Sequence, residues 1–304
     1  MRYRRLGRTG LNVSECAFGT SALKHCTPAE AGATLALAFD RGINAVEIDA
    51  GDGETVSALA EALKTEPDRG VQVFARATSL VRLDLPSPHV PAHQAYPGKH
   101  LRAEAEALLA RLGIERLALL QLHAWCPEWL HEGDWLETLE ALRREGKIAG
   151  FGVSLFDHDA EAGLEAVASG RIDSVQVMIN VFDPVAAAAL LPLCRRHDVA
   201  VIARSPLYYG ALAGTRDYPG DDWRRGYFFE EHRQETRERV ARLAREAGPL
   251  AETALRFGLS HPAVSTVAVG MRSPEQVETN VRALVQGPLE ADALGSLARH
   301  AWLA

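Results

Sequence analysis

The sequence alternates eight times between short runs rich in β-branched residues and amphipathic stretches of roughly ten to fifteen residues. Alternation of this kind is typical of βαβ units, in which the strands lie parallel in one sheet and the helices cover it. Eight units predict an α/β fold in which the sheet closes into a single (β/α)8 barrel, the TIM barrel. The predicted strands span residues 17–20, 45–49, 73–77, 117–122, 150–153, 174–180, 199–204 and 264–270.

Local signals mark where the helices begin and end. Thr27 and Glu30 form the pattern of a capping box, Pro28 suits the first helical position, and Gly42 ends the helix. Further helices, with apolar residues three and four positions apart, are predicted over residues 53–64, 101–112, 135–145, 160–169, 185–197 and 231–247. The long connections 78–100 and 206–230 are expected to build the mouth of the barrel, because mouth loops follow the strands in this fold.

Size and composition limit the classes of protein that fit. The 304 residues, 47% of them hydrophobic, are enough to bury one large core, so residues 1–304 are expected to form a single domain. A net charge of -7 with scattered basic residues argues against a nucleic-acid partner. No apolar run reaches the roughly 18 residues that a membrane helix needs, so we expect a soluble cytoplasmic protein with a small-molecule substrate. The four cysteines lie far apart and predict neither a disulfide framework nor a zinc ribbon.

Seven segments, in order along the chain, share a pattern with one enzyme family. They read RRLGRTGLNVSECAFGTSAL, FDRGINAVEID, LARLGIERLALLQLH, LRREGKIAGFGVS, VQVMIN, LPLCRRHDVAVIARSPLYYGALAG and LSHPAVSTVAVGMRSPEQVETN. Their order and spacing resemble the aldo-keto reductase superfamily over nearly the whole chain. The resemblance implies a barrel that binds NADP(H), preceded by an N-terminal hairpin that plugs the bottom of the barrel.

In that family a tyrosine hydroxyl protonates the alkoxide that forms when the nicotinamide delivers hydride to a carbonyl carbon. A lysine lowers the pKa of the tyrosine, an aspartate pairs with the lysine, and a histidine orients the substrate oxygen. Aligning GINAVEIDAGDG with the family pattern Gly-Ile-Asn-Phe-Phe-Asp-Thr-Ala-x-x-Tyr-Gly places Glu47 at the aspartate and Asp52 at the tyrosine. His123, at the end of LLQLH, matches the histidine.

The tyrosine and the lysine of the family are missing at their usual positions. Tyrosine occurs at positions 3, 96, 208, 209, 218 and 227, away from the second predicted strand. Ala77 aligns with the lysine, and the lysines of the chain are at positions 24, 64, 99 and 147. Arg76 is adjacent to Ala77, but neighbouring residues of a strand face opposite sides, so we expect Arg76 to point away from the site. The resemblance therefore predicts an atypical member with a degenerate catalytic tetrad.

At the adenine end of the cofactor site, the sequence matches the family pattern closely. The residues matching the family's contacts to the 2′-phosphate and adenine are Gly270, Arg272, Ser273, Gln276 and Asn280. A strand end meets a helix N-terminus there, which suits an anion. Those matching the loop that crosses the pyrophosphate are Ser205, Leu207, Gly210 and Leu212. The resemblance thus implies NADP(H) as the cofactor.

The nicotinamide end of the same site departs from the family pattern. Ser154 and Gln176 match residues that surround the nicotinamide. Leu155 replaces the asparagine that holds the carboxamide, and Arg204 replaces the aromatic residue that stacks on the ring. The redox end of the site is therefore expected to be rebuilt.

Chemistry limits what Asp52 can do in place of a tyrosine. An exposed aspartate, with a pKa of about 3.9, is ionised at neutral pH and cannot supply a proton, and a general acid is worth about 10²- to 10⁴-fold in rate. One hypothesis is an NADPH-dependent reductase of a small carbonyl-derived compound, such as an iminium or an activated alkene, with His123 as proton donor and Asp52 as charge stabiliser. A second is a redox-neutral lyase or isomerase that uses Asp52 or Glu47 as the base and His123 as its partner. A third is a non-catalytic nucleotide-binding barrel.

Several of these residues also have a structural interpretation. Asp52 stands before a predicted helix, where a cap is worth about 1 kcal/mol. Glu47 either acts in catalysis or forms an ion pair with Arg76 or Arg204. Arg204 either binds a substrate carboxylate or pairs with Asp52. His123 is either catalytic or a core histidine with its hydrogen bonds satisfied.

Two further groups of residues allow alternatives. Trp125 and Trp129 follow the fourth predicted strand, where they either wall a substrate pocket or cap the rim of the barrel. Glu47, Asp49, Asp52 and His123 are residue types that bind metals. Because no compact ligand spacing is present among them, no metal is expected.

Overall fold

Eight parallel strands form a closed barrel in this computed structural model, which describes residues 1–83, 90–214, 217–218, 220 and 222–303. The order around the barrel is β10-β3-β4-β5-β6-β7-β8-β9, so strands that follow one another in the chain lie side by side. The strands are β3 (Cys16–Gly19), β4 (Ala45–Asp49), β5 (Gln72–Ala77), β6 (Leu117–His123), β7 (Ile148–Ser154), β8 (Ser174–Met178), β9 (Ala200–Arg204) and β10 (Val264–Gly270). The predicted (β/α)8 fold is confirmed, with every strand end within about two residues of its prediction.

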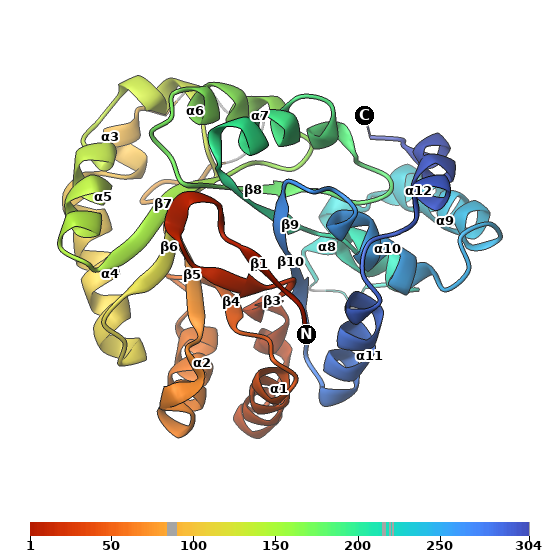
Figure 1. The fold of residues 1–304 in the computed structure, drawn as a ribbon, viewed down its shortest axis with the longest axis horizontal. Helices are drawn as coiled ribbons and strands as arrows, with labels where there is room; N and C mark the ends of the chain where they lie inside the picture. Colours follow the sequence, from red (N-terminus) through yellow and green to blue (C-terminus); the bar gives the residue numbers. More distant parts are fainter. Residues whose placement is uncertain (84–89, 215–216, 219, 221, 304) are drawn as a thin grey trace.

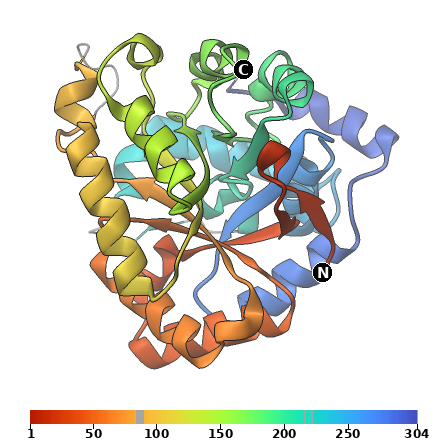
Figure 2. The same ribbon diagram turned by 60° about the vertical axis from the view of Figure 1, so that its left-hand side comes forward.

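Helices surround the strands on all sides (Figures 1 and 2). They are α1 (Pro28–Asp40), α2 (Gly53–Thr65), α3 (Ala92–Ala95), α4 (Gly98–Leu112), α5 (Trp135–Arg144), α6 (Leu164–Ala168), α7 (Leu190–His197), α8 (Arg224–Tyr227), α9 (Glu230–Ala244), α10 (Leu250–Leu259), α11 (Pro274–Val285) and α12 (Ala291–Leu297). The predicted capping box opens α1: Glu30 N–H donates to Thr27 Oγ1 at 3.3 Å, and Thr27 N–H donates to Glu30 Oε2 at 2.8 Å. No helix in the described residues is long and apolar enough to span a membrane.

Two predicted helices are shorter than expected. The segment 160–169 begins as a 3-10 turn (Ala160–Gly163) before α6, and Gly163 at the junction is a poor helix former. The segment 185–197 begins as a 3-10 turn (Val185–Ala187), and α7 starts only at Leu190. A continuous helix from 185 would place Pro192 in its interior, where proline clashes with the preceding turn. Starting at Leu190 puts Pro192 in the first turn, where proline is tolerated.

The N-terminal hairpin plugs the bottom of the barrel, as predicted. Strands β1 (Tyr3–Arg5) and β2 (Asn12–Ser14) pair in antiparallel fashion. The fully buried Leu6 and Val13 pack with inward-facing side chains such as Phe74, Leu119 and Ile202. Arg4 donates hydrogen bonds to the carbonyl oxygens of Leu259 and Val264, close to where β10 begins. The hairpin therefore closes the end at which the strands start.

Side chains inside the barrel change from apolar to polar towards the carboxyl ends of the strands. The lower layer is a small apolar core that includes Phe74 and Leu119. Two residues further along the same strands, inward positions carry Arg76 and Gln121. Glu47, Gln176 and Arg204 are likewise buried polar residues on neighbouring strands. A polar interior below the mouth is therefore the candidate site of this molecule.

Candidate functional site

Glu47 and Arg76 form a buried ion pair in the barrel interior. Arg76 Nε lies 2.7 Å from Glu47 Oε1 and 2.7 Å from Asp49 Oδ1. The expectation that Arg76 points away from the site is wrong. Arg76 is two residues from the inward-facing Phe74, so the alternation of the strand turns Arg76 inward and Ala77 towards the helices. Arg76 therefore supplies a cation beside Glu47, where the family has a lysine beside an aspartate.

The ion pair determines the electrostatics of Glu47. Burial raises the pKa of the Glu47 carboxyl, and the charge of Arg76 opposes that rise without cancelling it. Gln176 Nε2 approaches Glu47 Oε1 at 3.5 Å and donates to it. Of the interpretations open for Glu47, the structure shows the pair with Arg76.

Asp52 is the N-cap of α2, and its charge is matched by a lysine. Thr55 N–H donates to Asp52 Oδ1 at 3.4 Å, and Lys24 Nζ lies 3.1 Å from Asp52 Oδ2. Burial alone would raise the pKa of Asp52, but the hydrogen bonds from Lys24 and Thr55 outweigh it and hold the pKa below its usual value. Asp52 is therefore ionised at neutral pH and cannot donate a proton in place of the tyrosine.

Arg204 pairs with Asp157, so the alternative in which it pairs with Asp52 is wrong. Arg204 Nη1 lies 2.5 Å from Asp157 Oδ1, and Arg204 Nη2 donates to the carbonyl oxygen of Leu155 at 2.8 Å. Tyr209 completes the cluster: its hydroxyl donates to Asp157 Oδ2 and accepts from Arg204 Nη1 at 3.4 Å. Strand β9 carries Arg204 into the interior, while Asp157 and Tyr209 come from the loops after β7 and β9.

No residue pattern in the sequence singled out Asp157 or Tyr209 as a site residue. Their contact joins residues 52 positions apart, so no local spacing announces it. The only signal in the sequence is indirect: an arginine at position 204, where the family has an aromatic residue, needs a carboxylate partner when it is buried.

His123 is held at the end of β6 by two hydroxyl groups. His123 Nδ1 lies 2.9 Å from Ser154 Oγ, and the Tyr96 hydroxyl accepts from His123 N–H at 3.1 Å. Burial, together with the charges of Arg76 and Arg204, lowers the pKa of the His123 imidazole well below its usual value. The imidazole is therefore neutral at neutral pH and is a hydrogen-bond donor rather than a strong acid.

The adenine end of the expected cofactor site lies where β10 meets α11. Ser273 caps α11 by accepting from Gln276 N–H at 3.3 Å, and Gln276 Oε1 accepts from Arg272 N–H at 2.9 Å. Arg272 is exposed, Gly270 ends the strand, and Asn280 is buried on the inner side of α11. An exposed arginine at the positive end of a helix dipole fits the phosphate of a dinucleotide.

The loop expected to cross the pyrophosphate has an unusual backbone. Ser205, Tyr208 and Tyr209 adopt positive φ values of 53°, 44° and 53°, and Gly210 follows at 98°. Asn180 Nδ2 donates to the carbonyl oxygen of Ser205 at 3.3 Å, while Leu207 is half-buried and Leu212 is fully buried. Left-handed conformations at residues other than glycine tend to occur at functional sites.

At the nicotinamide end, a buried acceptor is unused among the described contacts. The side-chain oxygen of Gln176 is buried and has no hydrogen-bond partner, which suits the N–H of a carboxamide. Ser154 is buried beside His123. The residues present therefore fit a nicotinamide nucleotide at both ends, although the Arg204 cluster fills the place of the family's aromatic residue.

Trp125 and Trp129 cap the rim of the barrel, and the structure gives no support to a pocket wall. They are 1% and 0% exposed and pack edge to face with ring centroids 6.0 Å apart. Their indole N–H groups donate to the carbonyl oxygens of Ala162 and Val90. Both rings are thus enclosed by protein atoms. Among the described residues, no three His, Cys, Asp or Glu side chains gather as a metal site requires.

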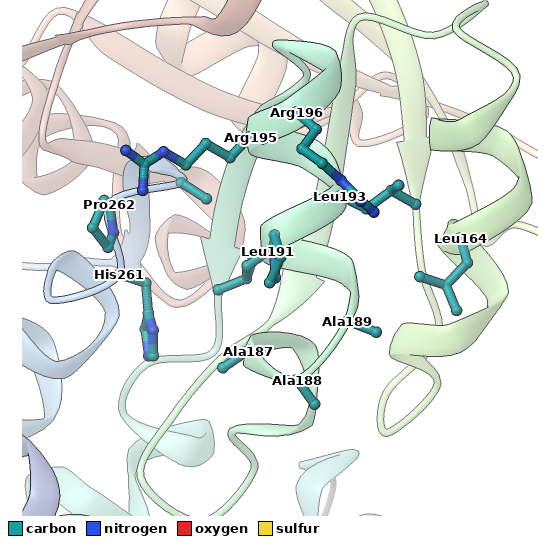
Figure 3. A pocket seen from close by; sticks show the side chains of 12 residues that line it. Leu164, Ala187, Ala188, Ala189, Leu191, Leu193, Arg195, Arg196, His261 and Pro262 are labelled. Atoms are coloured by element: carbon teal, nitrogen blue, oxygen red, sulfur yellow. The ribbon is translucent and has the colours of Figure 1, made fainter.

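A hollow of about 750 Å³ lies outside the barrel, between α6, α7 and residues 261–263 (Figure 3). Its lining is mostly alanine and leucine, with Arg195, Arg196 and His261 at its edges. Residues 261–263 directly precede β10, so they lie at the end of the barrel opposite the mouth. None of the predicted site residues lines this hollow.

The profile of the aldo/keto reductase family matches residues 15–301. The chain belongs to this family. It is 31% identical to the NADH-specific methylglyoxal reductase of Escherichia coli (strain K12), over 64% of this chain and 62% of that protein. It is 27% identical to the pyridoxal 4-dehydrogenase of Microbacterium luteolum, over 91% of each. Members of this aldo-keto reductase family are oxidoreductases that use a nicotinamide cofactor, which the residues at both ends of the site fit.

A solved structure shows the same fold. The holo form of the aldo-keto reductase AKR11C1 from Bacillus halodurans matches with a TM-score of 0.80 at 24% identity, covering 100% of this chain and 97% of that one. At this identity the likeness concerns the barrel and its helices. The side chains of the mouth remain particular to this aldo-keto reductase.

Proposed function

We propose that the protein is an NADP(H)-dependent oxidoreductase that reduces a small carbonyl compound at the mouth of the barrel. The observation that carries the proposal is the adenine end of the site. Arg272, Ser273 and Gln276 form an exposed, basic and hydrogen-bonded opening to α11. The positive end of a helix dipole and a guanidinium together favour the doubly charged 2′-phosphate that distinguishes NADPH from NADH.

Different side chains of the mouth polarise the carbonyl and bind the cofactor. When Nδ1 of the neutral His123 ring accepts from Ser154, its proton is on Nε2, which is free to donate to a substrate oxygen. Gln176 offers its unused oxygen to a carboxamide. The pair of Glu47 and Arg76 holds a fixed charge distribution beneath them. A bound nicotinamide supplies or accepts the hydride.

The contacts of Asp52 favour a neutral carbonyl over a cationic iminium. A carboxylate would stabilise a cationic C=N group only if its charge were available. Lys24, at 3.1 Å, already neutralises Asp52.

The same contacts weigh against a redox-neutral lyase or isomerase. That reaction needs a free base, but Asp52 is tied to Lys24 and Thr55. Glu47 is tied to Arg76. Neither carboxylate is therefore placed to remove a proton from a substrate.

Two measurements test the proposal. NADPH titrated into the purified protein should change its fluorescence with a Kd in the micromolar range typical of such enzymes. Small carbonyl compounds, beginning with methylglyoxal and pyridoxal because relatives are named for them, are then added while the absorbance of reduced nicotinamide is followed. No binding at high micromolar NADPH would exclude both the reductase and a nucleotide-binding barrel without catalysis. Binding with no turnover of any carbonyl would favour the non-catalytic barrel.

A further inference from the structure

Reduction of a carbonyl needs a proton donor, and the residues aligned with the family's tetrad do not provide one. Asp52 is ionised beside Lys24. His123 is neutral, and its imidazole is not a strong acid. Lys24, the one described lysine with a contact to a tetrad position, is used by Asp52. The alkoxide must therefore take its proton from another group at the mouth.

The side chain of Tyr209 carries a hydroxyl group. The fold brings this hydroxyl to the Arg204 cluster from a position far along the chain from the tetrad residues. The hydroxyl contacts Asp157 and Arg204, and Arg204 is close enough to Glu47 and His123 to affect the pKa of each. The hydroxyl therefore lies beside the buried Arg204, although it comes from the loop after β9 rather than from β4.

The backbone and the ring of Tyr209 are both fixed. The carbonyl oxygen of Tyr209 accepts from Arg224 Nη1 at 3.0 Å and from the Tyr218 hydroxyl at 3.3 Å. The ring packs edge to face against Trp223 and Tyr227, with centroids 5.0 Å and 4.8 Å away. A φ of 53° at a tyrosine costs conformational free energy, which these contacts offset. A left-handed conformation at a tyrosine of a mouth loop points to a role for its side chain.

Tyr209 carries its proton at neutral pH and can donate it. Burial raises the pKa of Tyr209 to about 12; the charge of Arg204 acts in the opposite direction, while Asp157 adds to the rise. The hydroxyl is therefore fully protonated at physiological pH. A free alkoxide is a stronger base than a phenolate, so the proton would move downhill.

We propose that Tyr209 is the proton donor of this enzyme, with Arg204 as the cation that stabilises its phenolate and Asp157 as the residue that positions both. This inference rests on the proposed function. The carbonyl carbon accepts the hydride of the reduced cofactor, and the π electrons of the C=O bond move to the oxygen. The Tyr209 hydroxyl turns from Asp157 to the alkoxide, and its O–H bond breaks as the O–H bond of the alcohol forms. The carbonyl is reduced, the cofactor is oxidised, and water returns a proton to the Tyr209 phenolate.

The residues around Tyr209 support both the loss of its proton and the return of a proton to the phenolate. Arg204 contacts the hydroxyl and Asp157 together, so its guanidinium stays beside the phenolate when the proton leaves. The Asp157 side chain is 25% exposed, which gives solvent a route for the returning proton. A tyrosine beside an arginine thus provides the proton and a neighbouring positive charge, although the pKa of Tyr209 stays above its usual value.

The test compares Tyr209→Phe with Tyr208→Phe. Both variants delete one hydroxyl from adjacent residues of the same loop, but the Tyr208 hydroxyl contacts His232 and Tyr227, not Arg204 or Asp157. For Tyr209→Phe we expect kcat for carbonyl reduction to fall by about 10²- to 10⁴-fold with the Kd for NADPH unchanged. The midpoint of urea unfolding should fall only modestly, as in Tyr208→Phe, because each variant loses the hydrogen bonds of one hydroxyl group. For Tyr208→Phe we expect kcat within about threefold of the wild-type value, because no reacting group is removed.

The pH profile separates a donor from a purely structural residue. The wild-type rate of reduction should be nearly constant between about pH 6 and 10, because Tyr209 stays protonated there. The residual rate of Tyr209→Phe should rise as the pH falls, since solvent must then supply the proton.

The possible outcomes bear on different claims. Equal activity of wild type and Tyr209→Phe, or equal losses in the two variants, would overturn the role of Tyr209 and leave the reductase proposal standing. A wild-type protein that binds NADPH but reduces no carbonyl, or that does not bind NADPH, would overturn the proposed function and the role of Tyr209 with it.

Discussion

The two carboxylates aligned with the family's tetrad show how neighbours determine what an acidic residue does. Asp52 and Glu47 are both acidic, but the pKa of Asp52 is lowered by Lys24 and Thr55 while that of Glu47 is raised by burial. From residue type alone, Asp52 could act in catalysis or cap a helix, and Glu47 could act in catalysis or form an ion pair. The contacts decide between them, because a charge in the interior is stable only with a partner.

For Asp52 we predict a structural contribution that depends on pH. Asp52→Ala should lower the free energy of unfolding by about 1 kcal/mol at pH 7, through loss of the helix cap. The pKa of Asp52 is lower in the folded state than in the unfolded chain. Its stabilising effect is therefore fully present above about pH 4 and declines as the pH falls through the folded-state pKa.

Urea unfolding at pH 7 and at about pH 3 measures this effect. Glu61→Ala is a suitable control, because Glu61 is an exposed acidic residue of the same helix whose contact is a surface ion pair with Lys64. A loss of stability in Asp52→Ala that stayed the same at both pH values would contradict the ionic part of the explanation.

For His123 we predict a neutral imidazole throughout the physiological range. Burial and the charges of Arg76 and Arg204 lower its pKa. In NMR spectra recorded between about pH 5.5 and 8, the ring protons of His123 should keep the shifts of the neutral form. The His123→Asn spectrum assigns the resonance. A transition of that resonance near pH 6.5 would show that the electrostatic argument is wrong.

At the scale of elements, local sequence signals predicted the ends of helices wherever the signal was itself local. The capping box at Thr27 and Glu30 is an example, because its two hydrogen bonds form within one helical turn. The helix predicted over 185–197 begins only at Leu190. Proline is tolerated in the first turn of a helix but not in its interior, so Pro192 sets how early the helix can begin. The connection 78–100 contains α3 and the start of α4, and residues 84–89 lie outside the described part of the chain.

The N-terminus of α11 gives a prediction for cofactor choice. Arg272→Ala should weaken NADPH binding by about tenfold or more and leave NADH binding nearly unchanged, because a charge-assisted contact to the 2′-phosphate is lost. Arg282→Ala, in the last turn of the same helix, serves as the control. Fluorescence titrations with both nucleotides measure the effect. Equal weakening for NADPH and NADH would rule out the assignment of Arg272 to the 2′-phosphate.

At the scale of the whole molecule, the barrel is held together by contacts between neighbouring strands and by the hairpin at its base. Leu6 and Val13 of the hairpin segment pack into the interior with side chains from several strands. Since the sheet closes on itself, none of the barrel strands that the structure describes forms a free edge. The single-domain expectation follows from this arrangement as a prediction about unfolding.

We predict one cooperative unfolding transition for residues 1–304. Far-UV circular dichroism and tryptophan fluorescence should give the same midpoint in urea, since Trp125, Trp129 and Trp135 are buried in one core cluster that packs on a single closed sheet. Separate midpoints for the two signals would show that part of the chain unfolds independently.

The sequence by itself determined the (β/α)8 barrel, and its resemblance to the family implied the hairpin plug that the structure shows. The adenine end of the cofactor site, implied by the same resemblance, stays a prediction. Strand and helix periodicities, caps and the G-M-R-S-P-E-Q segment are all short-range patterns, and each is satisfied by residues a few positions apart. Tertiary structure alone decided the chemistry of the mouth. The direction of Arg76 depends on the parity of one strand, and a shift by a single residue would have turned it outward. The contacts of Arg204, Asp157 and Tyr209 depend on the course of two loops that meet only after the barrel closes, so no local pattern in the sequence carries them.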